Sequence, residues 1–431
     1  MHGKIFQEGI KYLHERLSQL TDKRVGENQF IKMRDIGLSA FAVFFTQSSS
    51  FLEHQKLLKK RAGKSNSKSL FKIDHIPSDN HIREILDEVP PSEVFPIYDY
   101  LLARASKNKE LSTYRHLDNQ LLLALDGVHY FSSKKIQCSK CSQKHHKDGT
   151  TTYMHSMVGA TLVHPNKKRV LPLPPEFIEP QDGHAKQDCE VTAAKRWLMI
   201  HGNKYSKLGV IILGDDIYCH KPFCEAVVKA GCDFIFVCKP ESHRALYQDL
   251  EGLSKIAAIK TAEAKRDKAT WRCRYINQVE IKDEKDTFKI NWCEITILNN
   301  RQEVTYYNTF ATNKIITDKN VFNIVEAGRA RWKIENEHNN TLKNQGYYLE
   351  HNFGHGKKHL ASFLVTLMLL SFLFHSLLYL LDKRYRAIRN YWSRKMFFQQ
   401  LRTLLFYMYY ATWDALMECM VNAGEFELDS S

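Results

Sequence analysis

The spacing of apolar residues changes along the chain, and each change marks a predicted part of the fold. Residues 1–96 carry apolar positions at helical spacing, as in "DIGLSAFAVFFTQSSSFLE", and end in the proline-rich "EVPPSEVFP", so we predict a helical region there. In residues 97–240, strand patterns such as "QLLLALDG" and "KLGVIILGDD" alternate with helix patterns such as "QDCEVTAAKRWLMIHG". This alternation predicts an α/β fold with a mixed sheet covered by helices.

The second half of the chain begins with strands and ends with helices. Residues 241–320 alternate apolar and polar positions, as in "TWRCRYINQVEIK" and "TFKINWCEITIL", which predicts an inserted β-rich subdomain of half-exposed antiparallel strands. Residues 321–358 return to a helical pattern, and residues 359–431 remain helical. The apolar segment from Leu360 to Leu381 is long enough to cross a bilayer. Because it contains His375 and no second segment resembles it, we predict a buried core helix rather than a membrane span.

The charge balance indicates a polyanionic partner. The 431 residues include 62 Lys+Arg and 48 Asp+Glu, a net charge of +14, which favours nucleic acid first and an anionic membrane second. Residues 56–72 contain seven basic residues and no acid. Within this run we predict DNA contacts by Lys59, Lys60 and Arg61, with an ordinary solvated face as the alternative.

The cysteines point to a reducing compartment and to a metal. Ten cysteines show no disulfide-like framework, and the N-terminus is a polar amphipathic helix pattern without an apolar leader, so we expect a cytoplasmic protein. Cys138 and Cys141 in a CxxC pair, followed by His145 and His146, predict a knuckle over residues 136–155 that binds a structural zinc ion. The fourth ligand stays open between His146 and His155. The alternative is a pair of free thiols beside surface histidines.

Three acidic residues are candidates for a second kind of metal site. Asp126 and Asp215 each follow a buried strand, where sheet proteins place their ligands, and Asp126 precedes a glycine that suggests a turn. Two such carboxylates on neighbouring strands would share Mg²⁺ ions. On a helix, Glu335 shares a face with Arg331, four residues earlier, whereas Glu337 points nearly opposite, so at most one of the two glutamates faces the aspartates. The alternatives are turn or capping roles for the aspartates and an exposed ion pair for Glu335.

The segments around these acids resemble a known family. "LDGVHYFSS", "VIILGDDIY" and "RARWKIEN" are similar to the three catalytic blocks of cut-and-paste DDE transposases of bacterial insertion sequences, and most similar to the insertion-sequence-four type. The resemblance covers about residues 120–345. It implies a ribonuclease-H-like core with a β-rich insertion before the last acid. It also implies cleavage at the transposon ends and strand transfer into target DNA, with two Mg²⁺ (or Mn²⁺) ions.

The resemblance also implies partners and a location. These are the inverted repeats at the element ends, target DNA, and a second copy of the chain forming a homodimer in the DNA complex, with no membrane and a place in the cytoplasm at the nucleoid. Two other functions stay open: an inactive or domesticated DNA-binding protein that keeps the fold, and a metal-dependent nuclease without strand transfer.

Residue by residue, the resemblance assigns the catalytic roles to Asp126, Asp215 and Glu335. Asp216 is a rival to Asp215, and Tyr218, three residues after Asp215, favours Asp215 because the family has this Asp-x-x-Tyr arrangement.

Four further residues are implied to contact phosphate or DNA: Arg331, Trp332, Tyr218 and Lys343. Trp332 has core packing as its alternative. The family usually has a tyrosine where this chain has Gly328, and a lysine seven residues after the glutamate, where this chain has Leu342. Lys343 comes eight residues after Glu335, and one residue rotates a side chain by roughly 100° around a helix.

Overall fold

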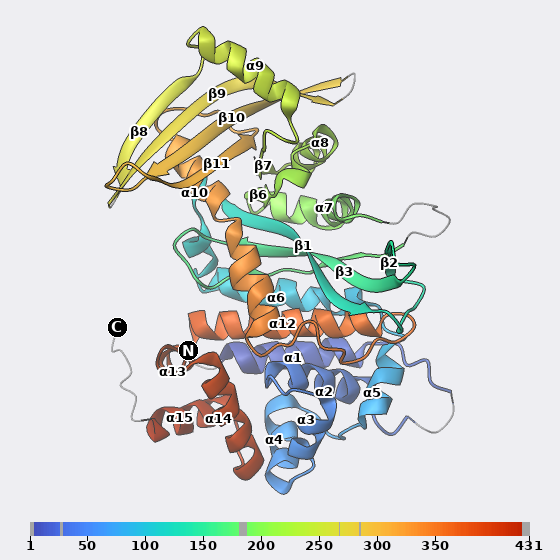
Figure 1. Cartoon of the computed structure of the whole chain (residues 1–431). Coiled ribbons are helices and arrows are strands. Elements are labelled where there is room, and N and C mark those ends of the chain that lie inside the picture. Colours follow the sequence, from blue (N-terminus) through green and yellow to red (C-terminus); the bar gives the residue numbers. More distant parts are fainter. Residues whose placement is uncertain (1–3, 26–28, 181–187, 267, 284–285, 425–431) are drawn as a thin grey trace.

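A sheet of eleven strands extends from the middle of the protein, at β1 and β3, to its upper end in Figure 1, at β8 to β11. The computed structural model describes residues 4–25, 29–180, 188–266, 268–283 and 286–424. The strands are β1 (Leu121–Ser133), β2 (Ser142–His145), β3 (Thr151–Val163), β4 (Leu171–Pro172), β5 (Glu176–Ile178), β6 (Val210–Gly214), β7 (Asp233–Val237), β8 (Lys260–Arg266), β9 (Ala269–Asp283), β10 (Asp286–Leu298) and β11 (Val304–Thr312).

The order of the strands gives the fold class. β1 lies at the centre of the first half, antiparallel to β3 on one side and parallel to β6 on the other, and β7 continues in parallel beyond β6. The short strands β2, β4 and β5 all pair with β3. Three antiparallel strands followed by two parallel ones form the mixed, ribonuclease-H-like sheet, flanked by helices, that the sequence predicted.

The strands of residues 241–320 extend this sheet rather than forming a sheet of their own. β11 pairs antiparallel with β7, and β10, β9 and β8 follow outward, each antiparallel to the last. The β-rich pattern was therefore read correctly for β9, β10 and β11. It missed the helix α9 (Arg244–Lys255), which lies across the outer strands in Figure 1. The boundaries of 241–320 as a separate subdomain stay a prediction.

Helices cover both faces of the first half of the sheet. They are α7 (Glu190–Ser206), α8 (Lys221–Lys229), α10 (Val321–Arg329), a π-helical turn (Ile334–Asn339) and α11 (Asn340–Asn344). A side chain at Gly127 of β1 would meet Glu190 of α7, whereas one at Gly159 of β3, opposite Asp126, would meet His338 of the π turn. Because neighbouring residues of a strand face opposite sides, α7 and the π turn lie on opposite faces.

The remaining helices form one layer built from both ends of the chain (Figure 1). Those from the N-terminal region are α1 (Lys4–Ser18), α2 (Met33–Phe45), α3 (Phe51–Leu58), α4 (Arg61–Phe71), α5 (Asp79–Leu86) and α6 (Phe95–Lys107). Those from the C-terminal region are α12 (Leu360–Leu381), α13 (Lys383–Tyr391), α14 (Arg394–Tyr407) and α15 (Trp413–Ala423). α1 confirms the helix predicted at the N-terminus, whose first three residues lie outside the described ones.

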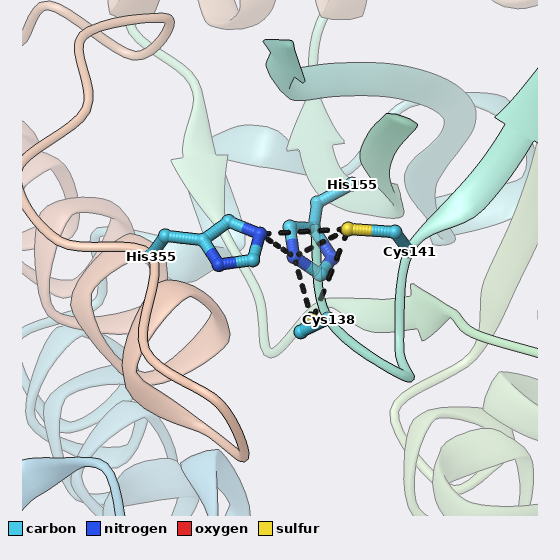
Figure 2. Close-up of side chains that lie close together, drawn as sticks. All are labelled: Cys138, Cys141, His155 and His355. Carbon is cyan, nitrogen blue, oxygen red and sulfur yellow. Dashed lines mark hydrogen bonds between the residues drawn. The ribbon is translucent and has the colours of Figure 1, made fainter. Parts of the chain in front are cut away.

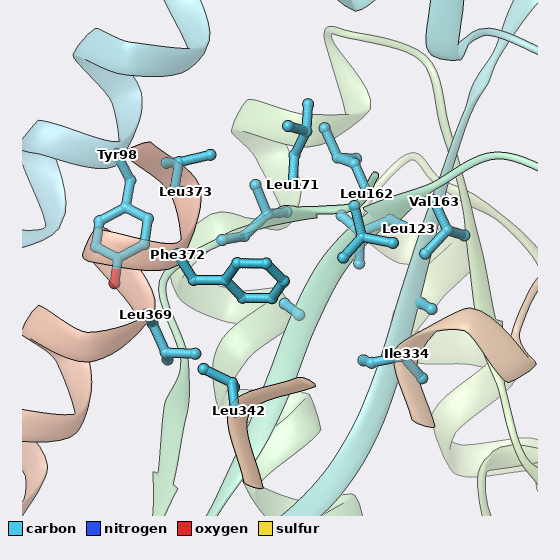
Figure 3. Close-up of a cluster of buried hydrophobic side chains, with 14 of the residues drawn as sticks. Tyr98, Leu123, Leu162, Val163, Leu171, Ile334, Leu342, Leu369, Phe372 and Leu373 are labelled. Atoms are coloured by element: carbon cyan, nitrogen blue, oxygen red, sulfur yellow. The ribbon is translucent and has the colours of Figure 1, made fainter. Parts of the chain in front are cut away.

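Within this layer, the long apolar helix α12 packs against both the other helices and the sheet. It is the one helix of the described residues that is long and apolar enough to cross a membrane, and 83% of its most apolar window is buried inside the protein. Figure 3 shows Leu369, Phe372 and Leu373 among side chains of α6, β1, β3, β4 and the π turn. His375 is satisfied there, since it donates to the carbonyl oxygen of Phe45 and accepts from the Tyr347 hydroxyl. The prediction of a buried core helix is confirmed.

Candidate active site

Asp126 and Asp215 lie next to each other, just past the point where the parallel pairing of β1 with β6 ends. The last residue pair between β1 and β6 is Ala124↔Leu213, and each aspartate follows its strand's member of that pair by two residues. Since side chains alternate along a strand, the two carboxylates project to the same side. The predicted turn at Gly127 is wrong, because β1 stays extended through this residue by pairing with β3 after β6 has ended.

The third acid is Glu335, on the π turn that follows α10. Arg331 Nη1 donates a hydrogen bond of 2.6 Å to Glu335 Oε1, and the charges of both residues act on Asp126. The charge of Glu337 acts instead on Lys333. The two glutamates therefore face different groups, as predicted, and Glu335 is the one that faces the aspartates.

Asp126 is held in conditions that favour its protonated form. Burial, followed by the negative charges of Glu190, Glu335 and Asp215, raises the pKa of Asp126 to about 7, although the Arg331 guanidinium acts in the opposite direction. Carboxylates that repel one another in this way suit a hard divalent cation, which prefers oxygen ligands and removes the repulsion.

The spacing of the acids bears on how many ions they would hold. Among the described residues, the groups whose potential ligand atoms all lie within 4.8 Å of one another consist of cysteines and histidines. Asp126, Asp215 and Glu335 are therefore spread more widely than the ligands of a single Mg²⁺, whose oxygens lie about 2.0–2.1 Å from the metal. A pair of ions about 3.5–4 Å apart matches a wider set of carboxylates.

A fourth carboxylate, Glu190, was not predicted. It is the first residue of α7, and its Oε1 accepts hydrogen bonds from the Gly127 backbone N–H at 3.0 Å and from the Tyr218 hydroxyl at 2.7 Å. It thereby joins the strand that carries Asp126 to the turn that carries Asp215. Tyr218 is fully buried, so the implied contact between Tyr218 and DNA is wrong in this structure, and the residue instead orients Glu190.

Asp216, the rival of Asp215, has a different task. Its buried carboxylate accepts a hydrogen bond of 2.6 Å from the Lys239 backbone N–H and another from the Ser242 hydroxyl, and it lies 3.5 Å from His243. These bonds tie the end of β6 to the loop after β7. Asp215 is left beside Asp126, and its catalytic role, which the Asp-x-x-Tyr arrangement implied, stays a prediction.

The π-helical turn changes the position of Lys343. A π turn inserts one extra residue into a helix, so residues beyond it are rotated back by roughly 100°. Lys343, eight residues after Glu335, is thereby returned to the face that the seventh residue would take in a regular helix. Leu342, which occupies the family's lysine place by counting, is fully buried, whereas Lys343 is partly exposed and pairs with Glu350 at 2.8 Å. The same turn places Asn339, whose Nδ2 donates to Asp126 Oδ2 at 2.8 Å.

Trp332 lies at the surface. Its side chain is 44% exposed, so the alternative of core packing is wrong. It borders a hollow of about 580 Å³ together with Trp271, Tyr306, Arg266 and Arg329. An exposed ring such as that of Trp332, beside guanidinium groups, can stack on bases while the arginines contact phosphates.

The predicted basic run forms part of a second aromatic surface. Lys59 and Lys60 connect α3 to α4, Arg61 begins α4, and all three are exposed. Lys60 and Arg61 border a hollow that Phe406, Tyr407 and Tyr409 line from the end of α14. These C-terminal rings carried no signal in the sequence, because nothing there shows that residues 406–409 return to α4.

The Cys/His cluster contains His155, one of the two alternatives left open for the fourth ligand, and His355, which was not predicted (Figure 2). Cys138 and Cys141 lie with His155 of β3 and with His355, from the segment between α11 and α12. His145 and His146 are directed elsewhere, to the hydroxyl groups of Thr151 and Thr152. The assignment of those two histidines is therefore wrong, because along the hairpin β2–β3 they lie beyond the turn that brings the cysteines together.

No protein-family model matches the chain. No curated protein matches it either. Among solved structures, the chain is similar to piggyBac transposase in a cryo-EM structure of its synaptic complex with hairpin DNA. The similarity covers 97% of this chain and 79% of that one, with 11% sequence identity and a TM-score of 0.39.

Proposed function

We propose that the chain is a DNA transposase of the insertion-sequence-four type, which cleaves DNA at the ends of a mobile element and joins those ends to target DNA. One observation carries the proposal. Asp126 and Asp215 have the same register on adjacent parallel strands, and they face the Arg331–Glu335 pair closely enough for the charges to alter the pKa of Asp126. Carboxylates in such an arrangement serve phosphoryl transfer with metal ions.

The three acids, Arg331 and Lys343 have different roles in the proposed reaction. Asp126, Asp215 and Glu335 would hold two Mg²⁺ or Mn²⁺ ions, which would supply activation of the attacking oxygen and stabilisation of the leaving oxygen of the phosphodiester. Arg331 orients Glu335 through its hydrogen bond and neutralises charge on the phosphate. Lys343, on the face restored by the π turn, contacts a phosphate of the bound strand. The attacking group is water in the cleavage step and the freed 3′-hydroxyl in the joining step.

DNA binding is shared between two surfaces. Trp332 and Arg329 lie on the same helical segment as Glu335, Arg266 joins them from the end of β8, and the three contact DNA near the cleaved bond. Lys59, Lys60 and Arg61, on the helical layer, contact the phosphates of the element end. The net charge of +14 favours both contacts. We further propose that two copies act together on paired element ends, in the cytoplasm at the nucleoid.

The test uses the inverted repeats that flank the gene. The purified chain is incubated with DNA of an element end, a target plasmid and Mg²⁺, and cleaved and joined products are separated on a gel. Asp126→Asn, Asp215→Asn and Glu335→Gln should each abolish both products while binding of the end DNA persists. Glu337→Gln is the matched control, since it removes the neighbouring carboxylate from the same turn and should leave both products.

Other outcomes assign other functions. Cleavage without joined products would indicate a metal-dependent nuclease. Binding without cleavage would indicate an inactive or domesticated DNA-binding protein. Equal loss in Glu335→Gln and Glu337→Gln would contradict the assignment of Glu335.

A further inference from the structure

The Cys/His cluster draws its four members from three separate parts of the chain (Figure 2). Cys138 and Cys141 lie between β1 and β2, His155 lies on β3, and His355 is 200 residues further on. The cluster is apart from the acids of the candidate active site, and none of its members has a role in the proposed reaction.

The distances within the cluster are those of a tetrahedron of zinc ligands. For bonds of about 2.3 Å to sulfur and about 2.0–2.1 Å to nitrogen, the edges should measure about 3.8 Å between sulfurs, about 3.5 Å between sulfur and nitrogen, and about 3.3 Å between nitrogens. The two Sγ atoms are 3.8 Å apart, and His155 Nε2 lies 3.1 Å from His355 Nε2. Three of the four distances between sulfur and nitrogen are 3.6 Å (Cys138 to His155), 3.5 Å (Cys141 to His155) and 3.4 Å (Cys141 to His355).

The surroundings of His355 direct the lone pair of its Nε2 toward the cluster. His355 Nδ1 lies 2.9 Å from the Gly356 carbonyl oxygen, which only accepts, so Nδ1 carries the proton and Nε2 is free to bind a metal. The ring of His155 stacks on Tyr130 with its centroid 5.7 Å away and an interplanar angle of 12°, which fixes its orientation. Two imidazole nitrogens and two sulfurs thus face one point, where a cation satisfies all four.

We propose that the protein binds one structural zinc ion through four residues: Cys138, Cys141, His155 and His355. Two thiolates and two imidazoles in tetrahedral geometry select zinc over the hard ions that the acids suit. All four positions are taken by protein atoms, as in structural rather than catalytic zinc sites.

The position of His355 gives the ion a specific task. His355 belongs to the segment that joins the helix of Glu335 and Lys343 to α12. On its other side this segment is held by Asp87, whose carboxylate accepts hydrogen bonds of 2.9–3.1 Å from four successive backbone N–H groups, those of residues 357–360. Zinc would therefore tie the segment to the β1–β3 hairpin, whose first strand carries Asp126. The ion links the strand of one catalytic acid to the chain that follows another.

Metal analysis tests the proposal without reference to activity. The wild-type chain, purified without chelator, should contain about one zinc ion per chain by mass spectrometry of its metals. Cys138→Ser/Cys141→Ser and His355→Ala should lose the zinc. His145→Ala and His146→Ala are matched controls of the same residue type on the same hairpin, and both should retain it.

A second measurement covers variants that fail to fold. Cobalt added to the wild-type chain after removal of zinc should give the visible absorption of a tetrahedral site with thiolate ligands. A wild-type chain that contains no zinc and takes up no cobalt in this form would overturn the proposal. So would zinc that is kept by His355→Ala and lost by His145→Ala. Neither result would affect the transposase proposal, which depends on the acids.

Discussion

Replacing Asp126 by Asn should remove the proposed activity and yet stabilise the metal-free protein at alkaline pH. Burial and the negative charges around it raise the pKa of Asp126 from 3.8 to about 7. Each pKa unit corresponds to 1.36 kcal/mol, so ionising this residue costs the folded protein roughly 4 kcal/mol relative to the unfolded chain. Asparagine does not ionise, and its amide oxygen can still accept the hydrogen bond that Asn339 donates.

The direction of the pH dependence follows from the protons bound in each state. Between pH 4 and pH 7 the folded protein keeps a proton on Asp126 that the unfolded chain has already lost. The stability of the wild-type protein therefore falls as the pH rises through this window and levels off above it. The variant lacks this loss, and roughly 2–3 kcal/mol of the difference between the two proteins should develop between pH 5 and pH 8.

The assay is the midpoint of thermal unfolding of both proteins at pH 5, 6, 7 and 8, in magnesium-free buffer without chelator so that bound zinc is kept. The midpoint of Asp126→Asn should exceed that of the wild type by several degrees at pH 8 and by less at pH 5. Added Mg²⁺ should raise the midpoint of the wild type at pH 8 and leave the variant unchanged. Glu337→Gln, the matched control, should follow the wild type. A variant that is less stable at pH 8, or a difference that is constant with pH, would refute the reasoning.

Two further predictions concern the support of the site and the DNA surface. In Gly127→Ala the new methyl group would lie 2.0 Å from Glu190 Oε2, so the Glu190 side chain must move away from its hydrogen bonds. DNA cleavage should then fall roughly 10–100-fold while DNA binding stays unchanged. The control is Gly252→Ala on α9, where a methyl group would enter open space and should have no effect. Unchanged cleavage in Gly127→Ala would mean that Glu190 does not support the acids. Lys59, Lys60 and Arg61 are replaced by Ala, and DNA affinity is measured at several salt concentrations. The slope of log affinity against log salt should become shallower by roughly 0.9 for each DNA phosphate that these side chains neutralise in the wild type. Lys11→Ala on α1 is the control. A slope that stays the same would place the DNA elsewhere.

Local patterns were enough to predict most of the sheet and the two aspartates. β-branched and apolar runs identified β1, β3, β6 and β7, and acids directly after two of those strands were expected to meet. This worked because strand formation and strand-end position are properties of short segments. The turn predicted at Gly127 failed because the strand is prolonged by β3, whose pairing is not visible in the segment itself.

The remaining parts of the site depend on contacts between distant segments. Glu190 is an ordinary acid at the start of a helix until the fold brings Gly127 and Tyr218 to it. His355 lies far from the CxxC pair in sequence, so the nearer His145 and His146 were chosen in its place. The π turn could not be read from residue counting, since an extra residue in a helix looks the same in sequence as a shift of register.

The packing of α2 against α12 has a consequence for how the protein is made. Nearly every residue of α2 is buried, and α12, which covers much of it, lies near the other end of the chain. At about 5–20 residues per second, the roughly 300 residues between them take about 15–60 s to synthesise. During that time the apolar surface of α2 is without its main partner, so the nascent chain depends on chaperones or on the ribosome surface for its solubility. The first 96 residues, expressed alone, should aggregate rather than fold.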